Sequence, residues 1–192
     1  MRNGGSVTGS YLLDDADRIA RAKAGDRNAF SELVRSHQSA VYRYLLRMLG
    51  SRDDALDLAQ DAFVRAWQAL PQWQPEARFR TWLLRIAHNA ALDALRRRRR
   101  VEFVALDDSL EPEAPAAGPE RQAQVTQQVR QLETSLGRLP PEHRDILLLR
   151  EVEALSYEEI GQVLSLSEGT VKSRVHHAMT RLRAAYDAED RR

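Results

Sequence analysis

The amino-acid sequence predicts an all-α protein, made of two small helical domains joined by a flexible acidic linker. Apolar residues recur every three or four positions through most of the chain, which is the period of an amphipathic helix. Helix breakers and aromatics are few, with 9 Gly, 7 Pro and 6% aromatic residues in 192. The pattern is lost at residues 101–119, which are acidic, proline-containing and unable to bury a core. We therefore expect domains at 14–100 and 120–186, with a disordered leader at 1–13 and a tail at 187–192.

Composition limits the classes of function. The formal net charge is +1, so any nucleic-acid binding must come from local basic patches. The chain has no cysteine, which removes disulfides and thiolate metal sites and is consistent with a reducing compartment. No apolar run reaches the length of a membrane span, and the first ten residues lack the apolar core of a signal peptide. The simplest expectation is a cytoplasmic protein.

Helices are predicted over residues 14–24, 28–49 and 51–70 from their apolar periodicity. The third is the most regular and has a continuous apolar stripe, formed by Ala55, Leu58, Ala59, Ala62, Phe63, Ala66, Trp67 and Leu70. The predicted helices end at residues that stop helices, namely Gly25, Gly50 and Pro71.

The opposite face of the third helix carries three carboxylates, Asp54, Asp57 and Asp61. Carboxylates one helical turn apart repel each other, so this face is either solvated or complementary to a basic partner. The pattern favours neither of these two interpretations. A metal site is less favoured, because no histidine or further carboxylate is placed to complete the coordination.

The stretch from Phe79 to Arg100 is predicted to be a helix with two chemically different faces. Its broad apolar arc is expected to pack, and the other face carries Trp82, Arg85, Asn89, Asp93 and Arg96. An aromatic plate beside an amide, a carboxylate and guanidiniums suits single-stranded nucleic acid, through base stacking, base-edge hydrogen bonds and phosphate contacts. The alternative is a core tryptophan beside solvated polar residues, with a basic helix end favoured by the helix dipole.

The stretch from Ser156 to Arg183 predicts a helix, a short turn and a longer helix. Ser156 and Glu159 have capping-box spacing, so the first helix begins at Ser156. Gly161 falls where a second helix can approach closely, and Ser167 can cap that second helix. Before this motif, a helix is expected up to Leu139 and another after Pro141. The helix after Pro141 should pack beneath the motif through Ile146, Leu147, Leu149 and Val152.

On the second helix of this motif, one side is apolar and the other presents small polar residues between cationic edges. Val171, Val175, Ala178, Met179 and Leu182 are expected to pack. The outward strip is Thr170, Ser173, His177 and Thr180, flanked by Lys172, His176 and Arg183 on one edge and by Arg174 and Arg181 on the other. A helix in the major groove needs small polar side chains for base edges and cations for phosphates. An amphipathic helical hairpin with a solvated basic face is the alternative.

The sequence shows no glycine-rich phosphate loop, no nucleophile beside a base and no cluster of metal ligands. We therefore expect a protein that is not an enzyme and that needs no cofactor, metal or small-molecule substrate. A nucleic-acid-processing enzyme is disfavoured for the same reason.

Taken together, these features resemble a bacterial sigma factor of the extracytoplasmic-function (ECF) type, from about Asp14 to Ala185. The stretches that carry the resemblance are DALDLAQDAFVRAW, FRTWLLRIAHNAALDALRR, LPPEHRDILLLREVEALSYEEIG and SEGTVKSRVHHAMTRLR. The resemblance implies region 2 in the first domain and region 4 in the second. It also implies a dissociable, non-enzymatic subunit that gives RNA polymerase its promoter specificity.

The resemblance further implies the partners and the residues that contact them. The partners are the polymerase core, through the coiled coil of its largest subunit and its flap, duplex and single-stranded promoter DNA, and an anti-sigma factor that is often membrane-anchored. Core polymerase would contact Asp54, Asp57, Gln60, Asp61 and Val64. The downstream promoter element and melted strand would contact Phe79, Arg80, Trp82, Arg85, Asn89, Asp93 and Arg96. The upstream duplex would contact Ser167, Thr170, Lys172, Ser173, Arg174, His176, His177 and Arg181.

One difference from the family pattern concerns the residues that would read the promoter sequence. Relatives often carry an aromatic residue or arginine where this chain has His176 and His177, so the promoter sequence cannot be carried over. Adjacent residues point about 100° apart on a helix, so this pair is poorly placed to share a metal ion. The competing function is a stand-alone helix-turn-helix regulator with an N-terminal dimerisation domain. It leaves the acidic helix and the face around Asn89 without a role.

Overall fold

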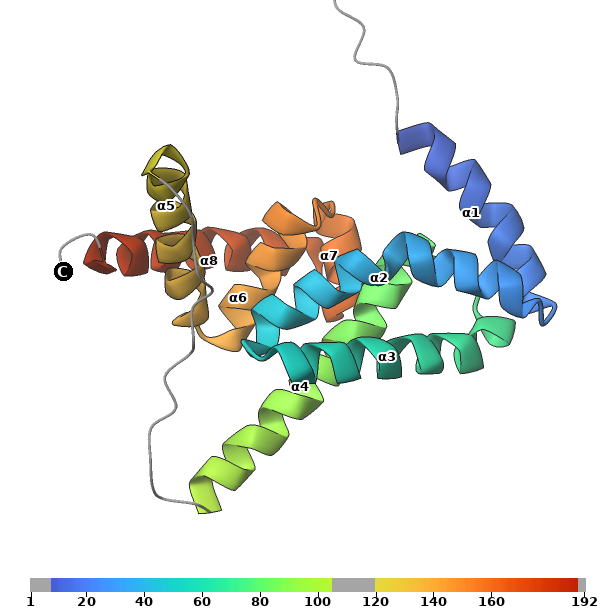
Figure 1. Ribbon diagram of the computed structural model, residues 1–192, viewed down its shortest axis with the longest axis horizontal. Coiled ribbons are helices and arrows are strands. Elements are labelled where there is room, and N and C mark those ends of the chain that lie inside the picture. Colours follow the sequence, from blue (N-terminus) through green and yellow to red (C-terminus); the bar gives the residue numbers. More distant parts are fainter. Residues whose placement is uncertain (1–7, 105–119, 190–192) are drawn as a thin grey trace, which may run out of the picture.

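The computed structural model describes the backbone of residues 8–104 and 120–189 and, apart from Arg99, the side chains of residues 15–100 and 127–189. All regular structure in these residues is helical, which confirms the predicted all-α class (Figure 1). The elements are α1 (Thr8–Lys23), α2 (Arg27–Leu49), α3 (Arg52–Ala69), η1 (Leu70–Gln72), α4 (Phe79–Val104), α5 (Glu120–Gly137), α6 (Pro141–Leu147), η2 (Leu148–Val152), α7 (Tyr157–Leu164) and α8 (Glu168–Glu189).

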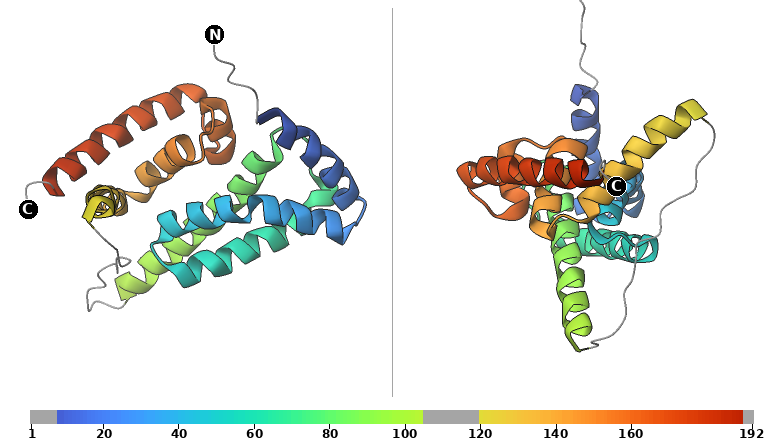
Figure 2. Two further views of the ribbon diagram at one scale, coloured as in Figure 1. Left: turned by 45° about the horizontal axis from the view of Figure 1, so that its top comes forward. Right: turned by 90° about the vertical axis from the view of Figure 1, so that its left-hand side faces the viewer.

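In the N-terminal half, α2 packs against α1, α3 and α4, and the last turns of α4 project away from the bundle (Figures 1 and 2). Local sequence defines the ends of α2. Asp26 is its N-cap and accepts hydrogen bonds from the amides of Asn28 and Ala29. Gly50 ends it in the left-handed conformation with φ 71°.

In the C-terminal half, α8 packs against α5, α6 and α7. The predicted capping box is present: the Glu159 amide donates to Ser156 Oγ at 3.1 Å, and the Ser156 amide donates to Glu159 Oε2 at 2.9 Å. Gly161 is needed for a close approach, but to the turn and not to a crossing helix. A Cβ there would lie 2.7 Å from the Leu166 carbonyl oxygen.

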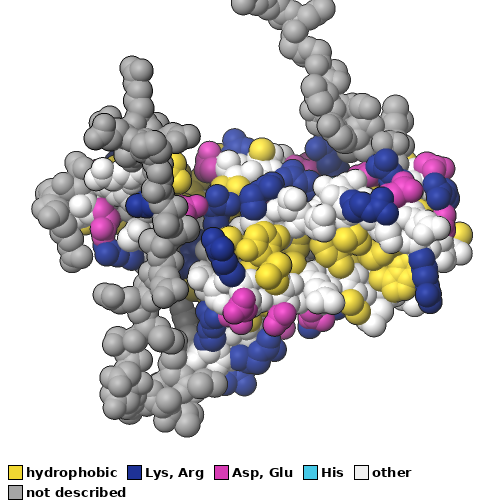
Figure 3. All heavy atoms as spheres, in the orientation of Figure 1, with side chains coloured by type: hydrophobic (Ala, Val, Ile, Leu, Met, Phe, Trp, Pro, Cys, Tyr) yellow, Lys and Arg dark blue, Asp and Glu magenta, His cyan; other side chains and the backbone are white. Residues whose placement is uncertain are grey.

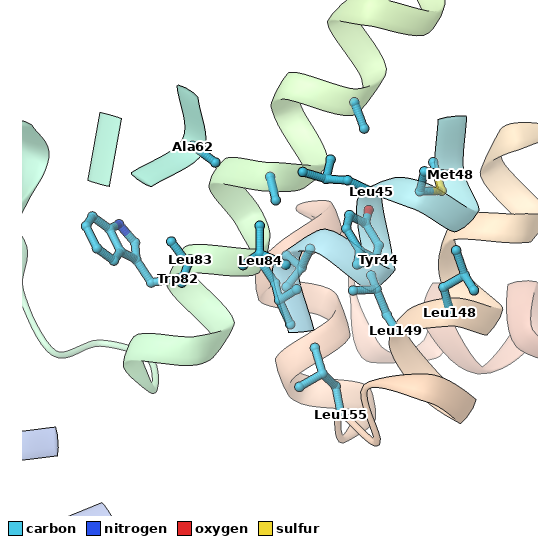
Figure 4. Close-up of a cluster of buried hydrophobic side chains, with 14 of the residues drawn as sticks. Tyr44, Leu45, Met48, Ala62, Trp82, Leu83, Leu84, Leu148, Leu149 and Leu155 are labelled. Atoms are coloured by element: carbon cyan, nitrogen blue, oxygen red, sulfur yellow. The ribbon is translucent and has the colours of Figure 1, made fainter. Parts of the chain in front are cut away.

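The two halves share one continuous hydrophobic core. Figure 4 shows Tyr44, Leu45 and Met48 of α2 beside Leu148 and Leu149 of η2. α4 also packs against α7, so the N-terminal bundle contacts the helix-turn-helix directly. The predicted domains are therefore in contact with each other.

Buried polar groups also join the halves. Tyr44 Oη donates to Asp145 Oδ1 at 2.6 Å, and His88 Nδ1 lies 2.8 Å from Asp145 Oδ2. Arg144 Nη1 donates to the Met48 carbonyl at 2.8 Å. Burial, and next the charge of Asp145, raise the pKa of Tyr44 well above 10, so its hydroxyl remains a donor.

Two predicted boundaries were wrong. α1 begins at Thr8, so residues 8–13 of the expected disordered leader are helical. α4 continues to Val104 and includes the first residues of the expected linker. A nucleated helix extends until a strong breaker is reached, and neither segment contains a proline. Residues 1–7, the rest of the linker at 105–119 and residues 190–192 lie outside the described part of the chain.

Two residues expected in the core are also exposed. Val152 is 40% exposed and is the last residue of the π-helix η2, whose turn departs from the α-helical period assumed in the prediction. Met179 is 45% exposed at the edge of the apolar stripe of α8, whose buried residues are Val171, Val175 and Ala178.

Candidate nucleic-acid and protein interfaces

A groove of about 780 Å³ lies between α2 and α3, where Figure 3 shows hydrophobic side chains gathered on the surface. Phe30 and Trp67 pack in it with ring centroids 4.9 Å apart. Leu56 is 57% and Val64 48% exposed, although both line the groove. An exposed apolar groove with polar edges is typical of a protein-binding surface.

Three of the five predicted polymerase-binding residues line this groove. Asp57, Gln60 and Val64 line it. Asp61 does not line the groove, and it forms an ion pair with Arg65 at 2.7 Å. Asp54 is engaged by Arg98 of α4 and does not line the groove. Sequence reasoning missed the apolar lining, because Phe63 and Trp67 were expected to be covered.

On α4, the structure separates the predicted strand-binding residues into exposed and buried groups. Arg85, Asn89, Asp93 and Arg96 are exposed on one face, and Arg96 lies 3.4 Å from Asp93. Trp82 is 8% and Phe79 5% exposed. The expectation of an open aromatic plate at Trp82 is therefore wrong in this structure.

The burial of Trp82 has a clear cause in the segment before α4. Its ring packs 5.5 Å from those of Trp73 and Phe79, forming an aromatic cluster with the loop that follows η1. Lys23 holds this loop by donating to the Trp73 carbonyl at 2.7 Å. The alternative of a core tryptophan describes this position correctly.

A cavity of about 360 Å³ lies beside this aromatic cluster. Its lining includes Gln72, Gln74, Arg85 and Trp82, together with Gln162 from α7. Sequence reasoning did not single out Gln72 and Gln74, because amides in a loop carry no periodic signal. Arg80 does not line the cavity and instead contacts Glu153 of the C-terminal half.

All the residues predicted to contact duplex DNA are exposed. They are Ser167, which directly precedes α8, and Thr170, Lys172, Ser173, Arg174, His176, His177 and Arg181 on α8. Lys172 donates to Glu168 at 2.7 Å, and this hydrogen bond raises the pKa of its ammonium. The rings of His176 and His177 are 5.9 Å apart in an edge-on arrangement. The structure thus presents the polar strip and its cationic edges to solvent.

Among the described residues, no group of three or more His, Asp or Glu side chains is arranged to hold a metal ion. In the same part of the chain, no helix has the length and apolar character needed to cross a membrane.

Two family models match separate parts of the chain. Residues 33–101 match the family model for Sigma-70 region 2, and residues 129–182 match that for Sigma-70, region 4. The ECF RNA polymerase sigma factor SigW of Bacillus subtilis is 32% identical over 86% of this chain and 93% of its own length. The chain belongs to the ECF sigma factors. The family is one of transcription initiation factors that are subunits of RNA polymerase.

Other sigma factors are similar over different lengths. SigE of Mycolicibacterium smegmatis is 40% identical over 92% of this chain, and the match covers 66% of that protein. The solved structure of CnrH in complex with the cytosolic domain of CnrY is 30% identical with a TM-score of 0.67, covering 91% of this chain and 98% of that one. The sigma factor RpoE in complex with the anti-sigma factor NepR, from Bartonella quintana, shares the fold at 22% identity and the same TM-score, over 82% and 96% of the two chains.

Proposed function

We propose that this ECF sigma factor has two domains, at residues 14–100 and 120–186, and that three surfaces on them bind different partners. The α2–α3 groove binds core polymerase, the exposed face of α4 binds the melted promoter strand, and the outward face of α8 reads the upstream duplex. The observation that carries the proposal is that all three surfaces lie mostly within the residues that match the Sigma-70 regions, and that each presents exposed side chains.

For the groove, we propose the coiled coil of the largest polymerase subunit as the partner. Leu56 and Val64 offer exposed apolar surface for a partner helix, and Asp57 and Asp61 lie beside them for its basic residues. Asp54 is assigned a smaller role, because Arg98 already neutralises it.

For α4, we propose that Asn89 and Asp93 contact base edges of the melted strand while Arg85 and Arg96 contact its phosphates. The cavity next to Arg85 is lined by the amides of Gln72 and Gln74, which can donate to and accept from an unstacked base. Trp82 forms part of the wall of this cavity, although it is only 8% exposed.

For α8, we propose that Ser173, His176 and His177 face base edges in the major groove while Lys172, Arg174 and Arg181 contact phosphates. The side chains project from one exposed helix whose other side is fixed by Val171 and Val175. A rigid helix presenting short polar side chains is the usual arrangement for direct readout.

We propose no enzymatic role, so that the chemistry remains in the polymerase. Because polymerase is the partner, the proposed location is the cytoplasm. A solved relative, CnrH, is bound to the cytosolic domain of CnrY, which supports an anti-sigma factor as a further partner and, if that factor is membrane-anchored, retention at the membrane face.

Run-off transcription with purified core polymerase on a library of genomic promoters tests the proposal. An ECF sigma factor produces promoter-specific transcripts that depend on both core and this chain. Sequence-specific duplex binding without any core-dependent initiation would instead support the stand-alone regulator.

A further inference from the structure

The loop at residues 73–78, between η1 and α4, forms much of the wall of the cavity of about 360 Å³. Four of its residues line the cavity, namely Trp73, Gln74, Glu76 and Ala77. The loop belongs to neither neighbouring helix, so its conformation depends on contacts with other parts of the fold.

Lys23, in the last turn of α1, contacts this loop from outside the cavity. Its ammonium donates a 2.7 Å hydrogen bond to the carbonyl of Trp73, and Lys23 itself does not line the cavity. A charged donor forms a stronger hydrogen bond than a neutral one. α1 also packs against η1, which leads into the loop. These contacts fix the start of the loop relative to α1.

The residue that Lys23 binds is also part of the aromatic cluster. The ring of Trp73 lies 5.5 Å from that of Trp82 and 5.9 Å from that of Phe79, both near the start of α4. Trp73 and Trp82 both line the cavity. In a closely packed cluster, a displacement of the Trp73 backbone would therefore move the cavity wall as well as the loop.

A second contact connects α1 to the same cluster. Asp15 Oδ2 lies 3.0 Å from Nε2 of His37 in α2, and the ring of His37 packs 5.4 Å from that of Phe79. α1 is therefore connected to the cluster at two points, through Asp15 and through Lys23. Such supporting contacts hold the residues of a binding site in place without touching the ligand.

The sequence position of Trp73 makes its anchoring relevant to DNA. Gln72 and Gln74, whose amides are proposed to contact an unstacked base, are its two immediate neighbours, so the position of the Trp73 backbone restricts where both amides lie. A loop that is already ordered loses less conformational entropy when its ligand binds. Fixing Trp73 should therefore increase affinity for the base.

We propose that Lys23 is a positioning residue for promoter opening, which holds the loop at residues 73–78 in the conformation that accepts an unstacked base and does not itself touch the DNA. The inference rests on the proposed base-binding role of the cavity. It adds α1, to which the proposed function gives no part, to the elements that determine affinity for the melted strand. Lys23 lies before residues 33–101, which match region 2.

Binding of single-stranded oligonucleotides to the holoenzyme tests the inference. The probes are the two fluorescein-labelled strands of a promoter selected by run-off transcription, and the same strands with one base at a time replaced by an abasic site. Fluorescence anisotropy gives each Kd. The abasic penalty is the Kd of the abasic strand divided by the Kd of the intact strand. The cavity position is the one whose penalty Gln72→Ala with Gln74→Ala reduces.

The test variant is Lys23→Met, which removes the donor and keeps an aliphatic side chain. The matched control is Arg21→Met, which removes an equal charge from an exposed position of the same helix, where Arg21 pairs with Asp17 and Asp26. Lys23→Arg retains a charged donor and should preserve binding.

Lys23→Met is expected to weaken binding of the intact strand at least about fivefold, because a charged hydrogen bond to the loop is lost. The Kd of the strand that is abasic at the cavity position should stay nearly the same, so the abasic penalty shrinks by the same factor. Arg21→Met and Lys23→Arg should keep the wild-type penalty. Equal weakening of the intact and abasic strands by Lys23→Met would overturn the proposal, because Lys23 would then contact phosphate or support the fold in general.

Fluorine NMR provides a second readout of the loop. The chain has 3 Trp, so incorporation of 5-fluorotryptophan gives three resonances, which Trp→Phe variants assign. Lys23→Met should shift the resonances of Trp73 and Trp82 and leave that of Trp67, in the α2–α3 groove, unchanged. A shift of all three would indicate a general change of fold, and a shift of none would show that Lys23 does not hold the loop. Either result would overturn the inference.

The abasic series also separates failure of the inference from failure of the proposed function. If Gln72→Ala with Gln74→Ala reduces the penalty at one position and Lys23→Met does not, the cavity binds a base and the role of Lys23 is wrong. If the glutamine variant reduces the penalty at no position of either strand, the cavity does not bind a base. The proposed function of the cavity then fails together with the inference.

Discussion

The hydroxyl of Tyr44 in α2 donates a 2.6 Å hydrogen bond to the carboxylate of Asp145 in α6, and so joins region 2 to region 4 through two buried side chains. His88 of α4 contacts the other oxygen of the same carboxylate at 2.8 Å. Buried polar contacts need specific partners, whereas apolar surfaces can slide. Tyr44 and Asp145 therefore fix how the two domains lie against each other.

Charge reversal at the α2–α3 groove should weaken the binding of core polymerase. Asp57→Lys with Asp61→Lys is expected to raise the Kd at least about tenfold, because opposite charges become like charges at the interface. Affinity for labelled core can be measured by fluorescence anisotropy. The matched control, Asp17→Lys with Glu76→Lys, reverses two exposed charges of region 2 that do not line the groove. Unchanged affinity in the groove variant would contradict the assignment of this groove to polymerase binding.

Lys172 should contribute affinity without sequence preference. Lys172→Ala is expected to weaken upstream-duplex binding across sequences and to reduce the salt slope by about one unit. Titrations at several salt concentrations, on specific and scrambled duplexes, measure both effects. Because Glu168 pairs with Lys172 at 2.7 Å, Glu168→Gln should act in the opposite direction. Lost sequence preference with an unaltered slope would make Lys172 a base-reading residue.

Gly161 should be intolerant of a side chain. A Cβ would lie 2.7 Å from the Leu166 carbonyl oxygen, so Gly161→Ala is expected to destabilise the protein by roughly 1–3 kcal/mol through displacement of the turn. Urea denaturation measures the change. Gly169→Ala is the control, since a Cβ there meets nothing within 4 Å and alanine favours the helix. Equal stability of the two variants would show that the turn adjusts freely.

Stability should decrease in mild acid because of His37. Burial lowers the pKa of His37 below its ordinary 6.5, even though Asp15 lies 3.0 Å away. The unfolded chain therefore takes up the proton first, and the free energy of unfolding falls as the pH drops through 6.5 toward the lower native pKa. His37→Gln should lose less stability than wild type between pH 7 and 5 in urea titrations. His176→Gln, on the exposed face of α8, should lose as much stability as wild type over this pH range. If His37→Gln also lost as much stability as wild type, the proposed effect of His37 would be contradicted.

The helices and their caps could be predicted because their causes are local. Ser156 and Glu159 lie within one turn of each other, and Gly50 ends α2 through its own backbone freedom. The exposure of Asn89 and Asp93 also followed from helical periodicity. These features need no information about distant parts of the chain.

The remaining features depend on tertiary packing. A helical wheel predicts the side of the helix on which Trp82 lies. It does not predict that the preceding loop folds back and packs Trp73 against it. The apolar groove between α2 and α3 exists because neither helix is fully covered by a neighbour there. The partners of Asp145 lie on other helices, far away in sequence, so no local pattern identifies them.

The most direct test of the account is permanganate footprinting of the promoter bubble formed by the Asn89→Ala holoenzyme. Asn89 is exposed on α4 and is proposed to contact only the melted strand. The account predicts normal binding of core and upstream duplex, with thymine reactivity in the bubble reduced at least about tenfold, corresponding to roughly 1.4 kcal/mol of lost strand contact. Full reactivity in the variant, with binding unchanged, would contradict the assignment of α4 as the strand-binding helix.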